Sequence, residues 1–166
     1  MSSKDMCMIE HIPELMASGI DSFKIEGRMK SAYYAAVTTN AYRHAIDDYL
    51  AGKEFNPLWL DECMKVSHRK YSTGFYFGDP GQYYADAHYF TDADVCGIVS
   101  TCDEEGNAVI SQRNKFSVGD KLELLTSEGE PKAFVLKEMY NAEGESIQSA
   151  PHPMMDVHMA LPEKCD

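Results

Sequence analysis

The segment from Asp21 to Lys30, DSFKIEGRMK, constrains the fold of this chain more than any other feature. Side chains alternate along a strand, so Phe23 and Ile25 share one face and Lys24 and Glu26 share the other. A glycine then ends the strand and a long helix follows. A strand that leads through a polar turn into a helix is half of an α/β unit, in which ligands bind beyond the carboxyl ends of the strands. The segment therefore predicts an α/β element with a site at its end.

A parallel strand needs a neighbour, and the sequence offers none. Between residues 1 and 90 we identify no second strand that would pair in parallel with the one expected over residues 20–26. One parallel strand cannot form a sheet, because its backbone groups would lack partners. We therefore expect this chain to be a piece of a larger, barrel-like structure.

Capping residues delimit the helices of the first 66 residues. Serine and asparagine side chains accept hydrogen bonds from the first free amides of a helix, proline suits its first turn, and glycine ends it. These signals predict helices over residues 12–18 and 31–51, and a short helix after Asn56-Pro57. Asp5 is expected to cap an earlier helical turn.

The pattern changes after Val66. Residues 67–93 are rich in Gly and Tyr and are expected to form an ordered connector. From Asp94 onward, short β-type segments alternate with polar turns, which predicts a small antiparallel barrel or sandwich. The fold class expected is α+β, with a helical remnant of a catalytic domain at 1–66, the connector at 67–93 and a small β-barrel domain at 94–166. Strands are predicted over residues 95–101, 108–113, 121–126, 132–140 and 154–161.

Charge is distributed unevenly along the chain, whose 166 residues carry a net charge of −12. Residues 1–90 hold 9 Lys and Arg against 12 Asp and Glu, a balance of −3, whereas residues 91–166 hold 6 against 15, a balance of −9. The acidic second half would repel phosphate backbones, which argues against an independent nucleic-acid binder there. The first half could still carry a local basic site.

The five cysteines are too widely spaced for a disulfide framework or a CxxC metal site. No signal peptide opens the chain, and no apolar run is long enough to cross a membrane. These features predict reduced thiols in a cytoplasmic protein that has no membrane partner.

Several segments together resemble one known family. They are SSKDMCMIEHIPEL at 2–15, GIDSFKIEGRMKSAYY at 19–34, VSHRKYSTGFYFG at 66–78, QRNKFSVGD at 112–120 and APHP at 150–153. Their content and order resemble the collagenase-like peptidases, peptidase family U32, whose catalytic type is unassigned. The resemblance implies a barrel-like α/β catalytic domain followed by a small β-barrel domain. It also implies that this chain holds only the last part of the former, so that its first partner is an upstream catalytic domain.

Cys7 gains a role through this resemblance. Some relatives bind a four-iron, four-sulfur cluster through four cysteines, and the resemblance implies three of them upstream and the fourth at Cys7. Such a cluster needs four thiolates, so this chain alone is expected to hold no cofactor. The alternative for Cys7 is a buried, inert thiol.

The charged residues after the expected strand form a second candidate site. Glu26 could act as a general base or orient an arginine, with Lys24 and Arg28 as further catalytic candidates. Arg28 and Lys30 could also hold a carboxylate or a phosphate. The alternative is a structural ion pair on a solvated face.

A third candidate site lies in the connector. His68 and Arg69, beside Tyr71 and the aromatic residues that follow, could stack against and neutralise a nucleotide. The alternative is aromatic packing. The sequence contains no HExxH or GxSxG motif, so neither zinc peptidase nor serine hydrolase chemistry is supported.

Three functions remain open. The first is a C-terminal fragment of a collagenase-like protease, inactive when isolated. The second is the accessory or substrate-binding part of an iron–sulfur-dependent hydroxylase that acts on RNA or on a quinone precursor. The third is a stand-alone binding module. The substrate would be a peptide or an RNA accordingly, and the incomplete first domain is expected to self-associate.

Overall fold

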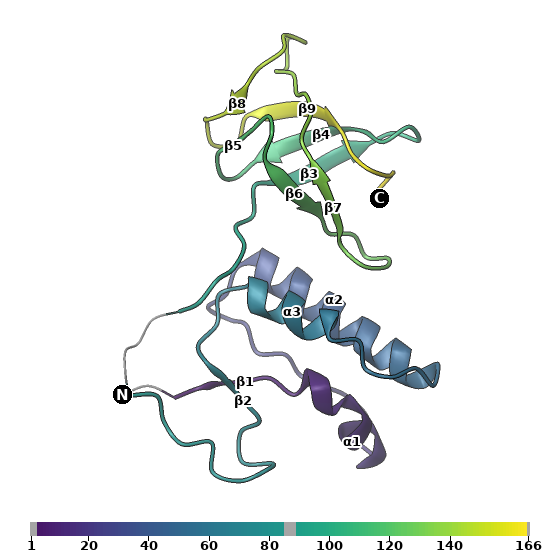
Figure 1. Cartoon of the computed structure of the whole chain (residues 1–166), viewed down its shortest axis with the longest axis vertical. Helices are drawn as coiled ribbons and strands as arrows, with labels where there is room; N and C mark the ends of the chain where they lie inside the picture. The colour runs from purple at the N-terminus through teal and green to yellow at the C-terminus, as the bar shows by residue number, and fades with distance from the viewer. Residues whose placement is uncertain (1–2, 85–88, 166) are drawn as a thin grey trace. The chain divides into compact units, whose positions relative to one another are not determined.

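The computed structural model describes residues 3–84 and 89–165 of the chain. It mixes helices with small sheets and divides into two compact units, unit 1 from Met1 to Asp94 and unit 2 from Val95 to Asp166 (Figure 1). Unit 1 carries the described α-helices, and unit 2 is built from short strands. The expected α+β composition is therefore present.

Unit 1 contains the expected helices, with the expected ends. The 3-10 turn η1 (Ile9–His11) leads into α1 (Ile12–Ala17), followed by α2 (Ala32–Leu50) and α3 (Leu58–Lys65). The Ser31 hydroxyl accepts a hydrogen bond from the amide of Tyr34 at 3.2 Å and so caps α2. Glycines with positive φ, Gly19 and Gly52, follow α1 and α2. Local signals were sufficient here because a helix satisfies its own backbone.

The strand expected over residues 20–26 does not form, and this prediction was wrong. Residues 20–27 are irregular, and no described strand pairs with them. The alternation of faces survives, since Phe23 and Ile25 are partly buried while Lys24 and Glu26 are exposed. The sequence pattern thus describes the side-chain environment correctly. Pairing, which makes a strand, depends on a neighbour that these residues lack.

A parallel pair that the sequence did not reveal exists elsewhere in unit 1, away from residues 20–26. Strand β1 (Asp5–Met6) pairs in parallel with β2 (Tyr71–Ser72), far away in the sequence. The amide of Cys7 extends the pairing with a hydrogen bond to the carbonyl of Ser72 at 2.9 Å. Asp5 therefore lies in a strand and caps no helix. Strands of two residues are too short to leave a pattern in the sequence.

The core of unit 1 joins these elements. Helices α2 and α3 lie side by side (Figure 1), and η1 packs against both. The Trp59 indole donates to the carboxylate of Asp48 at 2.9 Å and stacks on His44 at 4.7 Å between ring centroids. The buried residues of this core are Met8, Ile9, Ile12, Leu15, Ala41, Ala45, Trp59 and Cys63. Part of the expected connector, including β2, belongs to unit 1 as well, and its residues 85–88 lie outside the described residues.

Unit 2 consists of antiparallel strands. Strands β3 (Gly97–Cys102), β4 (Asn107–Gln112) and β9 (Asp156–Ala160) form one sheet in the order β3-β4-β9. Strands β6 (Lys121–Leu124) and β7 (Lys132–Val135) form a hairpin, and β5 (Phe116–Ser117) pairs with β8 (Ser149–Ala150). These strands enclose a second core of Ala108, Ile110, Phe116, Leu136, Met139, Ala150, Val157 and Met159.

The strands predicted over residues 95–101 and 108–113 form and pair as the β3–β4 hairpin, but the closed barrel is not confirmed. In the turn between the two strands the Asp103 carboxylate accepts the amides of Glu105 and Asn107 at 2.9 and 2.8 Å, and Gly106 takes a φ of 84°. Among residues 95–165 the strands form three separate small sheets and no closed barrel. The expected strand at 132–140 ends at Val135, because Leu136 turns away and its amide bonds to Asp120 at 3.0 Å.

Within the described part of the chain, no helix has the length and apolar character needed to span a bilayer.

Candidate functional site

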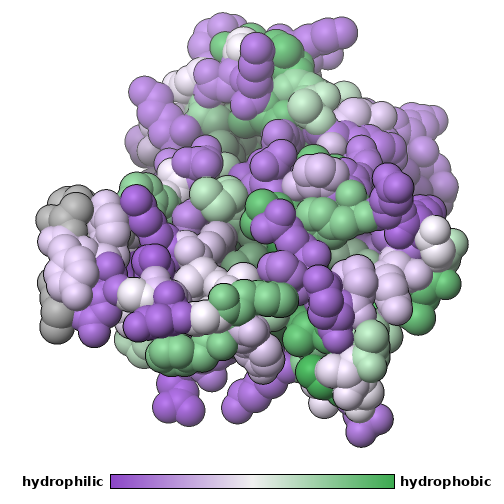
Figure 2. Space-filling model, turned by 60° about the horizontal axis from the view of Figure 1, so that its bottom comes forward, coloured by the Kyte–Doolittle hydropathy of each residue, from purple (hydrophilic) through white to green (hydrophobic). Residues whose placement is uncertain are grey.

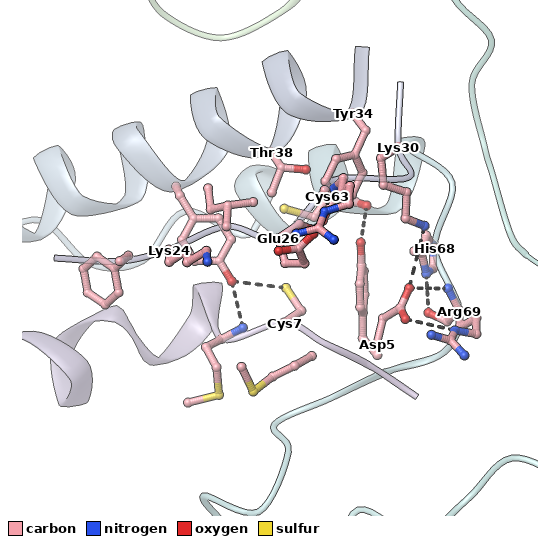
Figure 3. A pocket seen from close by; sticks show the side chains of 18 of the residues that line it. Asp5, Cys7, Lys24, Glu26, Lys30, Tyr34, Thr38, Cys63, His68 and Arg69 are labelled. Carbon is pink, nitrogen blue, oxygen red and sulfur yellow. Dashed lines mark hydrogen bonds and ion pairs between the residues drawn. The ribbon is translucent and has the colours of Figure 1, made fainter. Parts of the chain in front are cut away.

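A pocket of about 640 Å³ in unit 1 collects every candidate residue of the sequence analysis (Figure 3). We call it the Cys7 pocket. It is formed by β1, the irregular segment before α2, the inner face of α2, and the residues around β2. Three candidate sites that the sequence placed apart are thus parts of one cavity. Its lining includes Cys7, Lys24, Glu26, Arg28, Lys30, His68, Arg69 and Tyr71.

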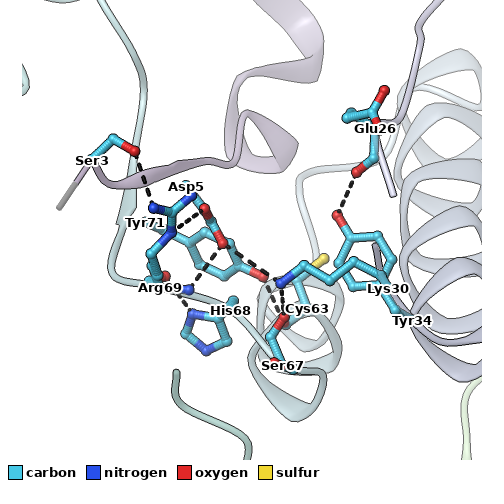
Figure 4. Close-up of polar contacts among 10 residues, drawn as sticks. All are labelled: Ser3, Asp5, Glu26, Lys30, Tyr34, Cys63, Ser67, His68, Arg69 and Tyr71. Carbon is cyan, nitrogen blue, oxygen red and sulfur yellow. Dashed lines mark hydrogen bonds and ion pairs between the residues drawn. The ribbon is translucent and has the colours of Figure 1, made fainter. Parts of the chain in front are cut away.

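An ion network centred on Asp5 forms one wall (Figure 4). The Asp5 carboxylate accepts hydrogen bonds from the backbone amide and the Nε of Arg69 at 2.9 and 3.0 Å. Lys30 Nζ lies 3.9 Å from Asp5 and donates to the carbonyl of Ser67 at 2.7 Å. Lys30 also lies over the ring of Tyr89 at 4.6 Å. The network therefore ties together the segments before α2, around β1 and around β2, which are distant in sequence.

Cys7 lies on this wall two residues after Asp5. Its half-buried thiol accepts a hydrogen bond from the Tyr42 hydroxyl at 3.8 Å, and the same hydroxyl accepts the amide of Met8 at 2.9 Å. The Cys63 thiol also donates to Cys7, and this bond is the largest of the effects that lower the pKa of Cys7 to about 7. Burial opposes the shift. The surroundings of Cys7 therefore favour a thiolate near neutral pH.

The groups around Cys7 keep their protons. Donation to Cys7, together with burial, raises the pKa of Cys63. Burial is the main cause that raises the pKa of Tyr42 and of Tyr71. Tyr71 donates its proton to the carbonyl of Cys63 at 2.8 Å. The pocket thus surrounds one thiolate with neutral hydrogen-bond donors.

His68 lies in the protein interior. It stacks on Tyr71 at 4.2 Å between centroids and packs against Phe90 at 5.9 Å. Its Nδ1 lies 2.7 Å from the carbonyl of Arg69, so Nδ1 must carry the proton. Its Nε2 is buried and has no hydrogen-bond partner among the described residues. The imidazole is placed as a packing element beside Arg69, and its predicted contact with a substrate stays a prediction.

Lys24, Glu26 and Arg28 lie at the exposed edge of the pocket. The Glu26 carboxylate accepts a hydrogen bond from the backbone amide of Arg28 at 2.9 Å, and not from the Arg28 guanidinium. Neither Lys24 nor Arg28 has an ion-pair partner within residues 3–84 and 89–165. An ion pair of this charged cluster among the described residues is that of Lys30 with Asp5, and the catalytic roles of Lys24, Glu26 and Arg28 stay predictions.

Sequence reasoning missed three residues of this site. Asp5 was expected to cap a helical turn, and Tyr42 and Cys63 lie in expected helices to which no site was assigned. Cys63 is in the core, 1% exposed. No local pattern could reveal their second role, since each meets Cys7 or Arg69 only through contacts between distant segments.

Comparison with known proteins identifies the family. The model of peptidase family U32 matches residues 1–86, and that of the peptidase family U32 C-terminal domain matches residues 91–166. The chain belongs to peptidase family U32. The expected family resemblance is thereby confirmed over almost the whole chain.

Relatives in this family carry two kinds of name. The chain is 37% identical to tRNA hydroxylation protein P1 of Bacillus subtilis, covering 99% of the chain and 40% of that protein. It is 40% identical to tRNA hydroxylation protein P of Escherichia coli, covering 98% of the chain and 37% of that protein. Over 48% of the chain and 20% of the relative, it is 56% identical to an uncharacterized protease of Methanocaldococcus jannaschii. The chain thus spans about two fifths of the length of the first two relatives.

Proposed function

We propose that this chain is part of a U32 protein that takes part in the hydroxylation of tRNA. The observation that carries the proposal is the similarity along almost the whole chain to two proteins named for that process. Since the chain spans about two fifths of their length, the proposal includes a catalytic domain outside this chain that completes unit 1.

The role proposed for Cys7 is that of one ligand of an iron–sulfur cluster. Its donor chemistry fits, because such clusters take soft thiolates and the surroundings of Cys7 lower its thiol pKa to about 7. No group of three or more His, Cys, Asp or Glu among the described residues could hold a metal ion. The other three thiolates are therefore proposed to come from outside this chain. Such a cluster supplies electron transfer when it is bound.

The residues of this chain would then hold the ligand cysteine and the substrate. Asp5 and Arg69 fix β1, and the hydrogen bond from Cys7 to Ser72 fixes the backbone of the ligand itself. Lys24 and Arg28 would hold anionic groups of a substrate at the edge of the pocket, beside Lys30, which is engaged by Ser67 and Asp5. Glu26 would accept a proton or orient a cation there.

Peptide hydrolysis is the second candidate, favoured by the family name and by the M. jannaschii relative. Since a Cys7 pKa of about 7 already favours the thiolate, a cysteine peptidase would still need a histidine beside it that protonates the leaving amine. The hydrogen bonds of Cys7 come from Cys63, Tyr42 and a backbone amide, and the proton on Nδ1 of His68 is directed to Arg69. We therefore expect this chain to cleave neither gelatin nor casein.

The test of the proposed function is a measurement on tRNA. The gene for the full protein that carries this chain is deleted in its host, and the tRNA nucleosides are analysed by mass spectrometry. A hydroxylated nucleoside should disappear, return with the wild-type gene, and not return with Cys7→Ala. Unchanged hydroxylation after deletion would reject the function. Cleavage of gelatin by the purified chain, abolished by Glu26→Gln or Cys7→Ala, would favour the peptidase instead.

A further inference from the structure

The Cys7 pocket has a local charge opposite to that of the chain. Its lining contains four cations, Lys24, Arg28, Lys30 and Arg69, and two carboxylates, Asp5 and Glu26, a balance of +2 before the Cys7 thiolate is counted. The chain as a whole carries −12. Cations gathered in a concave site raise the local concentration of an anionic partner. The partner that fits this pocket is therefore anionic.

Two of the four cations are available to that partner. Arg69 is engaged by Asp5, and Lys30 by the carbonyl of Ser67. Lys24 and Arg28 are exposed, and the described residues provide no carboxylate bound to either. They lie four residues apart on one irregular segment. Two exposed cations at one edge of a pocket can each contact a phosphate group of a strand that runs along that edge. A ligand with a single carboxylate would use only one of them.

Aromatic side chains lie exposed on the same pocket. Tyr76 is 64% exposed and Tyr89 is 56% exposed, and both line the cavity. Lys30 and Arg69 lie over the Tyr89 ring at 4.6 and 5.8 Å, so that ring is held in position by two cations. Figure 2 shows hydrophobic residues interspersed among hydrophilic ones on the face of the molecule that it draws. Exposed aromatic rings next to cations form a platform on which unpaired bases stack.

We propose that the edge of the Cys7 pocket binds an unpaired segment of RNA, with Lys24 and Arg28 on its phosphates and Tyr76 and Tyr89 against its bases. The strand must be unpaired, because a base in a duplex offers its face to its neighbours and not to a protein ring. Buried His68 and half-buried Tyr71 take no part in the contact. This inference rests on the proposed function for its choice of RNA, and it adds the form of the RNA and the residues that bind it.

The experiment measures binding by the whole chain. A fluorescein-labelled RNA of about twelve nucleotides, within the length that single-strand binding sites cover, is titrated as a single strand and again annealed to its complement. Anisotropy is recorded over a range of salt concentrations. The single strand should bind more tightly than the duplex, and its affinity should fall as salt rises. Tight binding of the duplex, or no binding of the single strand, would overturn the proposal.

Variants then separate phosphate contacts from base contacts. Lys24→Ala with Arg28→Ala should weaken binding and reduce the salt slope by about 1.4, since each phosphate contact to a single strand contributes about 0.7. Tyr89→Ala should weaken binding roughly 5- to 100-fold without changing that slope. Arg43→Ala, a cation on α2 outside the pocket, is the control and should change neither. Fluorescence of Trp59 verifies the fold of unit 1 in each variant. An unchanged slope in the double variant would contradict the proposal.

Two further arms identify other outcomes. An acidic peptide that binds as tightly as the RNA and displaces it would assign the pocket to a protein partner and overturn the proposal.

The binding assay does not depend on hydroxylation, so this inference and the proposed function can be rejected separately. Binding as expected with unchanged tRNA nucleosides in the deletion strain would reject only the proposed function. Lost nucleosides without binding would reject only this inference.

Discussion

The elements within unit 1 and the elements within unit 2 are connected in different ways. In unit 2, β4 pairs along its length with β3 and β9, so a continuous backbone ladder of three strands lies against the core. In unit 1, the described parallel pairing has only two residues in each strand, and the side chains of Asp5, Arg69 and Lys30 supply the rest of the connection. The backbone hydrogen bonds of a ladder persist when most side chains are replaced, whereas a network of side chains loses a contact whenever one of its members is replaced. The residues that position the candidate site are therefore individually sensitive, and those of unit 2 are sensitive mainly in its core.

The largest expected effect tests whether the two units are independent. Phe116 is buried in the core of unit 2, so Phe116→Ala should lower the unfolding free energy of that unit by about 3–5 kcal/mol. The only tryptophan of the chain, Trp59, lies in unit 1 and reports on that unit alone. In a denaturant titration, far-UV circular dichroism should show that unit 2 unfolds at a lower denaturant concentration than in the wild type. The unfolding transition reported by Trp59 fluorescence should not shift. If the Trp59 transition shifts by the same amount, the units unfold together.

The next effect concerns the Asp5 network of unit 1. Asp5→Asn removes the charge that Arg69 and Lys30 face, and should lower the unfolding free energy of unit 1 by about 1.5–3 kcal/mol, which is what hydrogen bonds to charged groups contribute. Hydrogen exchange should show reduced protection of the Cys7 amide. Asp21→Asn, an exposed change in the same unit, is the control. Equal effects from both variants would show that the network does not connect the segments.

A smaller effect concerns the reactivity of Cys7 in the metal-free chain. Because the Cys7 pKa is about 7 and the ordinary value is 9.0, alkylation should rise with pH through about 7. Tyr42→Phe removes one donor, so the pKa should rise; a rise of about one unit would slow alkylation at pH 7 about fivefold and leave the rate above pH 9 unchanged. Tyr49→Phe on the same helix is the control.

The same pKa has a consequence for stability, with its sign set by linkage. Between about pH 7 and 9 the folded Cys7 has lost its proton while the unfolded thiol retains it, so the stability of unit 1 should increase with pH in that window. The contribution is lost as pH falls through about 7. Denaturation of wild type and Cys7→Ser about one pH unit below and about one pH unit above the folded pKa of about 7 measures it. A slope that persists in Cys7→Ser would assign it to another group.

The smallest effect is expected on the surface of unit 1. Arg43 and Asp47 form an ion pair on α2 with both side chains 55% exposed. Exposed pairs contribute little, so Arg43→Ala should change the unfolding free energy by less than about 0.5 kcal/mol. Urea denaturation followed by Trp59 fluorescence measures the change. A loss as large as that of Asp5→Asn would remove the distinction between surface pairs and the pocket network.

Local chemistry by itself determined much of this protein. The caps at Ser31 and Asn56, the glycines after α1 and α2, and the turn at Asp103 all came from the sequence, because each satisfies backbone groups within a few residues. The exposed and buried faces of residues 20–27 followed from alternation alone. The candidate residues were also visible, as charged, aromatic and thiol side chains in segments that resemble the family.

Only the tertiary structure decided what those residues form together. The sequence placed a strand at residues 20–26, beside which no described strand lies, and none at Asp5 and Tyr71, which pair across 66 positions. It placed Cys7, Glu26 and Arg69 in three separate sites, which the fold gathers in one pocket. Strand pairing and a shared cavity are contacts between distant segments, and a local pattern carries no information about which distant segment arrives. The pKa of Cys7 is decided in the same way, by Cys63 and Tyr42 on two helices that the sequence could not bring to it.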